Sequence, residues 1–121
     1  MIRAGLAAYN RGDVEAALEN YDPAVEFVTL LMGDHQGKPA LRHFAEENLK
    51  TLSGYKLEPE EMIDLGDKVI AVVRMAGAGR VSGIALGDKI ALLFTLKNGL
   101  VVRQQTLRSR EDALEAASLP E

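Results

Sequence analysis

Few side chains in this sequence carry the chemistry of a general acid, a general base or a nucleophile. The 121 residues include two histidines and no cysteine. Cysteine nucleophiles, disulfides and thiolate metal sites are therefore excluded. The histidines, His35 and His43, are eight positions apart and form no metal-ligand motif with a carboxylate, so we expect no metal site.

Two residues are candidates for moving a proton, and each has a structural alternative. Tyr9 lies on the first predicted helix, where its hydroxyl could donate to a ligand or pack in the core with that hydroxyl satisfied. His35 lies in a predicted loop over residues 32–38, flanked by glycines. It could act on a substrate, because loops often carry function, or be a solvated loop histidine.

Two arginines could orient a ligand or serve the fold. Arg74 lies in an apolar strand, where hairpin counting pairs Pro59 with Arg74 and makes Glu61 its diagonal neighbour. It could hold a ligand or form a structural ion pair. Arg108 ends a strand just before a helix, so it could meet an anionic ligand or bond to nearby carboxylates.

The elements that position these residues follow from the hydrophobic pattern. Apolar residues recur at helical spacing in segments 2–11, 14–21 and 39–52, and Ser109 begins a last helix. The predicted strands are 25–31, 57–65, 68–76, 81–96 and 100–108, with Gly83 and Gly87 bending the fourth. Hydrophobic residues make up 47% of the chain. We expect one α+β domain over residues 1–121, with helices on one face of a mostly antiparallel sheet.

The register of the last hairpin decides which polar side chains share a face. A two-residue turn at Asn98-Gly99 pairs Leu92 with Gln105, whereas a three-residue loop with a bulge pairs Leu92 with Gln104. A slip of one residue exchanges the two faces of the strand. The second register places Gln104, Thr106 and Arg108 on one face, which also holds Ile90, Leu92, Phe94 and Val102.

Charge and hydropathy exclude some partners. The formal net charge is −4, so the basic surface typical of nucleic-acid binding or of anionic membrane binding is absent. The longest apolar run after the first helix is Ile90–Phe94, which is too short to span a membrane. The first residues do not form a signal peptide, so we expect a cytoplasmic protein.

Four ordered pieces of the sequence resemble the SnoaL-like family of the nuclear-transport-factor-2-like superfamily. They are Tyr9–Asp13 with Tyr21–Phe27, then Gly37–Phe44, then Asp64–Ile70, and finally Asn98–Val102 with Ser109–Ala117. The resemblance implies a curved sheet, wrapped by the N-terminal helices into a cone with an internal pocket. It also implies a homodimer formed through the sheet, and we expect no cofactor.

The resemblance does not imply one activity, because the superfamily includes isomerases, cyclases, epoxide hydrolases and binding modules. The positions that hold the ketosteroid isomerase base, tyrosine and acid correspond to Phe27, Gly5 and Leu92. The arginine and aspartate of the epoxide hydrolases correspond to Arg74 and Ala76. Neither mechanism has its carboxylates here. A cyclase needs only one acid or histidine in place to move a proton, which His35 could supply.

Two hypotheses follow for the function. In the first, the pocket binds a small hydrophobic, carbonyl- or polyketide-like compound, with or without isomerase- or cyclase-type catalysis. Its ligand-binding residues are Phe27, Arg74, Leu92, Phe94, Gln104, Thr106 and Arg108. In the second, the domain is a non-catalytic dimerisation or interaction module. The volume of the cavity discriminates between them, since a ligand site needs roughly 300 Å³.

Overall fold

The computed structural model describes residues 2–29, 33–51, 56–76, 80–81, 84–85 and 89–118. Its helices are α1 (Ile2–Asn10), α2 (Val14–Ala17), α3 (Lys38–Thr51) and α4 (Arg110–Ala117). Its strands are β1 (Tyr21–Thr29), β2 (Gly33–Gln36), β3 (Lys56–Asp64), β4 (Lys68–Ala76), β5 (Arg80–Val81), β6 (Ile84–Ala85), β7 (Lys89–Lys97) and β8 (Leu100–Leu107).

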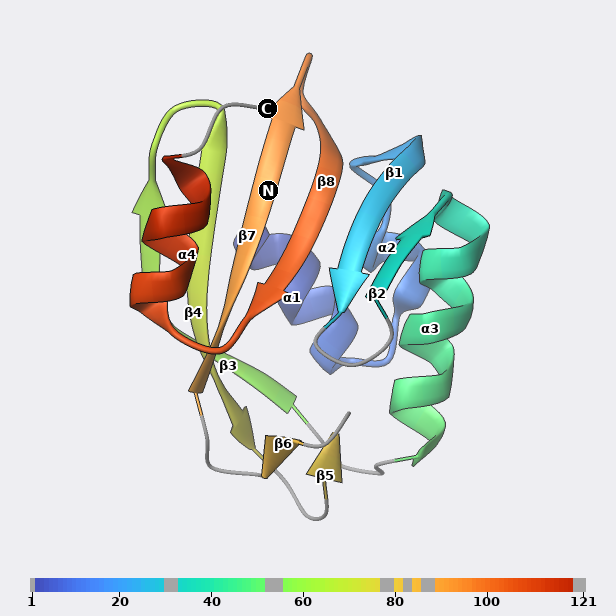
Figure 1. Ribbon diagram of the computed structural model, residues 1–121. Coiled ribbons are helices and arrows are strands. Elements are labelled where there is room, and N and C mark those ends of the chain that lie inside the picture. The colour runs from blue at the N-terminus through green and yellow to red at the C-terminus, as the bar shows by residue number, and fades with distance from the viewer. Residues whose placement is uncertain are drawn as a thin grey trace.

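Six strands form one curved sheet in the order β2-β1-β8-β7-β4-β3 (Figure 1). All neighbours are antiparallel except β1 and β8, which run parallel. The α+β class and the mostly antiparallel sheet are therefore confirmed. Pro59 lies in β3 at one edge of the sheet, where its missing N–H costs least.

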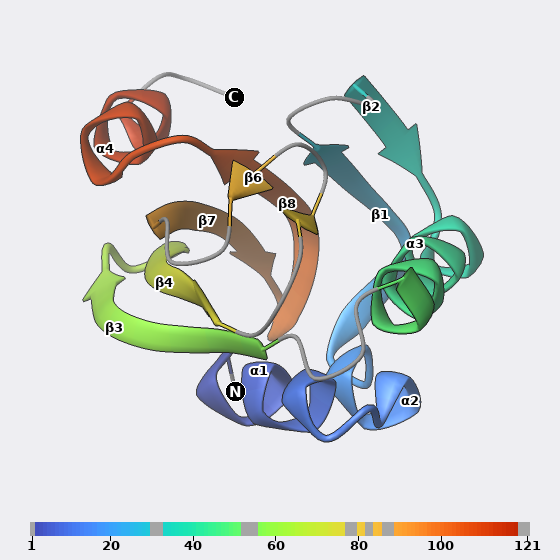
Figure 2. The same ribbon diagram turned by 90° about the horizontal axis from the view of Figure 1, so that it is seen from below.

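Two apolar clusters cover the two faces of the sheet. The larger one joins α1, α2 and α3 to the concave face, with Val25, Val73 and Leu92 among its buried members. The smaller one packs α4 on the opposite face, against Ile70 and Leu93 (Figure 2). The prediction that all helices lie on one face is wrong for α4. Its reason is in the sequence, because β4 and β7 are apolar on both faces and need cover on both.

The turn between α1 and α2 follows its predicted chemistry, but the second helix is shorter than predicted. Gly12 has a φ of +81°, and the Asp13 carboxylate accepts a hydrogen bond from the Ala16 N–H at 3.2 Å. The helix ends at Ala17 instead of residue 21. The Asn20 carbonyl accepts a hydrogen bond from the Val101 N–H at 2.9 Å, so pairing with β8 replaces the last helical turn.

The Asn10 side chain fastens α1 to the edge strand β3. Its Nδ2 donates to the Leu57 carbonyl at 2.8 Å, and its Oδ1 accepts from the Leu57 N–H at 2.9 Å. The amide thus satisfies both backbone groups of Leu57, as a neighbouring strand would. These two bonds hold the N-terminal helix across the concave face of the sheet.

Two segments differ from the sequence expectation. Residues 33–36, expected as loop, form β2 and pair with β1 through Phe27 and His35. The single strand expected over residues 81–96 is wrong, since β5 and β6 pair with each other and only β7 joins the main sheet. Gly83 and Gly87, which were expected to bend this strand, lie outside the described residues.

The last hairpin combines features of both expected registers. Asn98 and Gly99 form a two-residue turn with φ values of +53° and +79°, as in the first register. A bulge then shifts the pairing, so that Leu92 lies opposite Thr106 and Phe94 opposite Gln104. Gln104 and Thr106 therefore share the concave face with Leu92, as in the second register. The bulge turns Val101 to the concave face in place of Val102.

Candidate functional site

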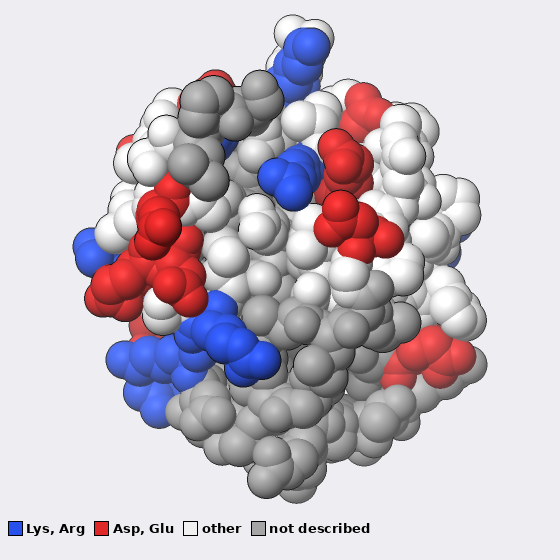
Figure 3. Space-filling view, viewed as in Figure 1, with Lys and Arg blue, Asp and Glu red and all other residues white. Residues whose placement is uncertain are grey.

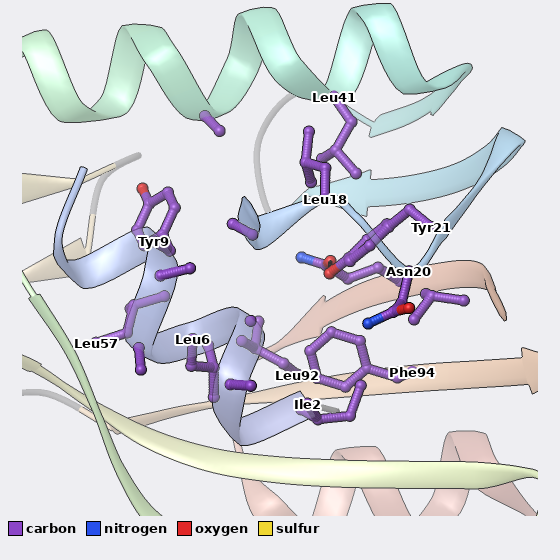
Figure 4. A pocket seen from close by; sticks show the side chains of 18 of the residues that line it. Ile2, Leu6, Tyr9, Leu18, Asn20, Tyr21, Leu41, Leu57, Leu92 and Phe94 are labelled. Atoms are coloured by element: carbon purple, nitrogen blue, oxygen red, sulfur yellow. Dashed lines mark hydrogen bonds between the residues drawn. The ribbon is translucent and has the colours of Figure 1, made fainter. Parts of the chain in front are cut away.

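The concave face and the N-terminal helices enclose a cavity of about 520 Å³ (Figure 4). Side chains of α1, the end of α2, α3 and the inner rows of β1, β3, β4, β7 and β8 converge on it. Its walls are mainly apolar, and they include Ile2, Leu6, Leu18, Leu41, Leu57, Met75, Ile90, Leu92 and Phe94. A mainly apolar cavity of this size is typical of small-molecule sites.

One wall of the cavity is polar, and β8 supplies it. Gln104 and Thr106 alternate with outward residues along the strand, so both line the cavity. They stand opposite Phe94 and Leu92 of β7, which are 2% and 4% exposed. A ligand that touches this wall would meet an amide and a hydroxyl within an apolar surround.

Tyr21 adds a third polar group and contacts the first. Its hydroxyl donates a hydrogen bond to Oε1 of Gln104 at 2.5 Å. Burial raises the pKa of the Tyr21 phenol above its usual range, because the phenolate would lose its hydration. The phenol therefore keeps its proton at neutral pH and acts as a donor, not as a base.

Charged side chains stand only at the rim of this cavity among the described residues that line it. They are Arg11 and Glu19, and both are exposed. Within the described part of the chain, no cluster of three or more His, Cys, Asp or Glu side chains could hold a metal ion. The described lining thus offers hydrogen bonds but no buried charge.

The structure places Arg74 away from the cavity. A bulge between Pro59 and Glu61 shifts the expected register, although Glu61 still pairs with Val72. Arg74 forms an ion pair with Glu60 at 2.9 Å, and Lys89 meets the same carboxylate at 2.9 Å. Hydrogen bonds from Lys89 and Arg74 lower the pKa of Glu60. The geometry fits the structural ion pair, with Glu60 in place of Glu61 as the partner.

Phe27 and His35 form an aromatic stack behind the cavity wall. Phe27 is 3% exposed, and its ring centroid lies 5.2 Å from that of His35 and 5.8 Å from that of Phe44. Neither Phe27 nor His35 is among the described residues that line the cavity. The Nε2 atom of His35 is buried, and none of the described residues forms a hydrogen bond with it. His35 therefore belongs to a strand and a packed cluster, not to a solvated loop.

The remaining predicted residues divide between the cavity and the surface. Tyr9 lines the cavity from α1, as expected from its helix. Arg108 is exposed just after the end of β8 and is not among the described lining residues. The structure thus brings Tyr9, Leu92, Phe94, Gln104 and Thr106 together and leaves the other predicted site residues outside.

Tyr21 lines the cavity, although its sequence pattern did not predict this. Its spacing from Val14, Ala17 and Leu18 suited a helix, which placed its ring in simple helix packing. In the structure Tyr21 begins β1 and lies beside Val101 in the parallel pair with β8. Only the long-range pairing of β1 with β8 brings its hydroxyl to Gln104.

The part of the chain described here contains no helix that is both long and apolar enough to cross a membrane.

Comparison with known proteins identifies a family and a shared fold. Residues 2–104 match the family model of the SnoaL-like domain. Bal32a from a soil-derived mobile gene cassette is similar, with a TM-score of 0.77 and 24% identity over 95% of this chain and 91% of that chain. A candidate polyketide cyclase from Sinorhizobium meliloti has a TM-score of 0.73 and 25% identity over 87% of this chain and 91% of its own.

A third similar structure is that of TerC co-crystallised with polyporic acid. Its TM-score is 0.72, with 23% identity over 94% of this chain and 92% of that chain. No curated protein matches the sequence. At these identities the solved structures establish the fold, and the chemistry has to be argued from the site.

Proposed function

Since this chain belongs to the SnoaL-like domain family, we propose that it binds a small hydrophobic, carbonyl-bearing compound of the polyketide-like class inside the cavity. The observation that carries this proposal is the cavity of about 520 Å³ with one polar wall at Gln104 and Thr106. Its volume exceeds the roughly 300 Å³ that a ligand site needs. A module used only for dimerisation would have no need of such a space.

The proposal is for binding without carboxylate catalysis. Phe27 and Leu92 occupy the positions where the family resemblance would put a base and an acid, and neither can transfer a proton. Among the described lining residues the one carboxylate is Glu19, which is exposed at the rim. Tyr21 holds its proton because burial raises its pKa, and its hydroxyl donates to Gln104.

Two similar structures agree with this class of ligand. One is a candidate polyketide cyclase, and the other was crystallised with polyporic acid. Both share the cone-shaped fold with this chain, so an aromatic carbonyl compound is a reasonable first probe.

Native mass spectrometry of the freshly purified chain tests the proposal first, since it detects any retained small molecule. Titration with 2-acetylnaphthalene, with the bound fraction measured by equilibrium dialysis, then determines the affinity directly. We expect saturable binding at one site per chain, and Thr106→Phe should weaken it, because the ring takes up space beside Gln104 and the polar wall loses its hydroxyl. The control is Gln105→Phe, because the neighbouring residue points to the other face of β8. Failure of the unsubstituted chain to retain or bind any such compound would refute the proposal.

We also propose that the chain forms a homodimer through the convex face of the sheet. Helix α4 packs mainly on β4 and β7 on this face and contacts β8 less. A basic group over β8 there lies beside acidic groups over β1 (Figure 3). Arg103 is the basic residue of β8, and Glu26 is its partner in register on β1. In a two-fold dimer, Arg103 of each copy would lie opposite Glu26 of the other, so opposite charges would face each other.

A further inference from the structure

The polar wall of the cavity is built so that one amide faces the ligand space in a fixed orientation. The Tyr21 hydroxyl donates to Oε1 of Gln104, which occupies the accepting end of that amide. The donating end, Nε2, then remains for whatever fills the cavity. Gln104 lines the cavity, so its Nε2 is in position to meet a ligand there.

We infer that Tyr21 positions Gln104 as a hydrogen-bond donor that selects neutral ligands with a carbonyl oxygen. This inference rests on the proposed binding function and specifies the ligand that the site prefers. Gln104 is the residue that would touch the ligand. Tyr21 acts through Gln104 and is a positioning residue.

The electrostatics of the cavity argue for a neutral ligand. The charged residues among its described lining, Arg11 and Glu19, are exposed at the rim and opposite in sign. A carboxylate drawn inside would lose its hydration and meet no buried cation among the described lining residues. A ketone or quinone oxygen loses much less, and a single amide donor satisfies it.

The protonated phenol makes this orientation stable near neutral pH. Burial raises the pKa of Tyr21, so its hydroxyl remains a donor across the ordinary pH range. Turning the Gln104 oxygen to the ligand would break this bond and leave the Tyr21 oxygen to accept from Nε2 in its place. The cavity therefore presents a donor to carbonyl compounds.

Three probes with one ring system test this inference on the full chain. They are 2-acetylnaphthalene, 2-ethylnaphthalene and 2-naphthoate at pH 8, each measured by equilibrium dialysis. The hydrocarbon reports the apolar cavity alone, the ketone adds an acceptor, and the carboxylate adds a charge. We expect the carboxylate to bind at least about tenfold more weakly than the ketone.

Substitutions then isolate the amide and its positioning residue. Gln104→Leu should lower the affinity for the ketone by about tenfold, which is the contribution of one ordinary hydrogen bond. The affinity for the hydrocarbon should stay the same or increase. Tyr21→Phe should lower the affinity for the ketone by a smaller factor and leave the affinity for the hydrocarbon unchanged. The matched control is Gln105→Leu, which removes the same side chain from the opposite face of β8 and should alter neither probe.

A spectroscopic readout separates positioning from simple packing. In ¹⁵N-labelled protein, the ketone should shift the Gln104 side-chain amide resonances, and the hydrocarbon should shift them far less. In Tyr21→Phe these resonances should move even without a probe, because the amide loses its fixed partner.

Either of two results would overturn the inference and leave cavity binding intact. One is an equal loss of ketone and hydrocarbon affinity in Gln104→Leu. The other is a carboxylate that binds as tightly as the ketone. If the unsubstituted chain binds none of the three probes and retains no compound after purification, the proposed function fails, and the inference fails with it.

Discussion

Asn10 shows how one side chain can hold two distant elements together. Its amide bonds to both backbone groups of Leu57, although the two residues are 47 positions apart in the chain. Strand β3 is at the edge of the sheet, so no further strand pairs with these two backbone groups, and the Asn10 amide bonds to them instead. The residue therefore fixes the position of α1, and α1 carries Tyr9 and the inner wall of the cavity.

Asn10→Ala should lower the free energy of unfolding by about 2 kcal/mol, since it removes two partly buried hydrogen bonds of about 1 kcal/mol each. Urea unfolding followed by circular dichroism measures the change. The control is Asn20→Ala, which truncates the same side chain at an exposed position and should change stability by no more than about 0.5 kcal/mol. Equal effects of the two substitutions would show that the Leu57 bonds contribute nothing.

Single residues of the site were predictable only where a strand pattern fixed their direction. Gln104 and Thr106 interrupt an apolar row of β8, and their spacing of two places both on the same face of the sheet. The register of the hairpin then decides that this face is the inner one. Arg74 could be recognised as an ion-pair residue, but the bulge in β3 changed its partner to Glu60. A bulge depends on the whole sheet, so hairpin counting alone could not locate it.

Glycines at two places show how an element depends on its backbone conformation. Gly99 completes the β7–β8 turn with a φ of +79°, and a Cβ there would meet nothing within 4 Å. Gly5 lies inside α1 with an ordinary helical φ, and a Cβ there would lie 3.4 Å from the Ala17 carbonyl oxygen. The same methyl group therefore strains the turn and suits the helix.

Gly99→Ala should destabilise the protein by about 1 kcal/mol, because a left-handed backbone is costly for any residue with a Cβ. Gly5→Ala should stabilise it by up to about 1 kcal/mol, because alanine loses less backbone entropy in a helix interior. Thermal unfolding of the two variants and of the unsubstituted chain measures whether each substitution raises or lowers the stability. A loss of stability in both variants would mean that α1 cannot accept a methyl group so close to Ala17.

Elements with strong local signals were predictable, and elements made by distant pairing were not. Consecutive residues suffice to predict three features: the Asn98-Gly99 turn, the Gly12-Asp13 junction and the Ser109 cap of α4. Strand β2 has the polar sequence Gly-Asp-His-Gln and exists because β1 pairs with it. The start of β1 at Tyr21 likewise depends on β8. Local periodicity therefore assigned Tyr21 to a helix.

At the scale of the whole molecule, the convex face of the sheet has an unusual feature beside α4. The Nε atom of Arg103 is buried there and has no hydrogen-bond partner among the residues that the structure describes. A buried guanidinium nitrogen without an acceptor is costly, and a carboxylate from a second copy would supply one. In a two-fold interface the pair repeats itself, so Arg103 of each copy would meet Glu26 of the other.

The proposed dimer therefore depends on the sign of the charge at position 103. Sedimentation velocity at micromolar concentration should give twice the mass of one chain. Arg103→Glu should raise the dissociation constant at least about tenfold, because it sets like charges against each other and leaves carboxylates without cations. The double variant Glu26→Arg, Arg103→Glu exchanges the charges and should restore the dimer.

Circular dichroism must show that Arg103→Glu stays folded, since Glu26 also neighbours position 103 within one chain. Binding of 2-acetylnaphthalene by the resulting monomer is then informative. The cavity is enclosed by one chain, and its lining lies on the concave side, whereas Arg103 lies on the other. The monomer should therefore keep its affinity for the probe. A monomeric unsubstituted chain would refute the dimer, and a monomeric variant that loses the probe would show that the convex face supports the cavity.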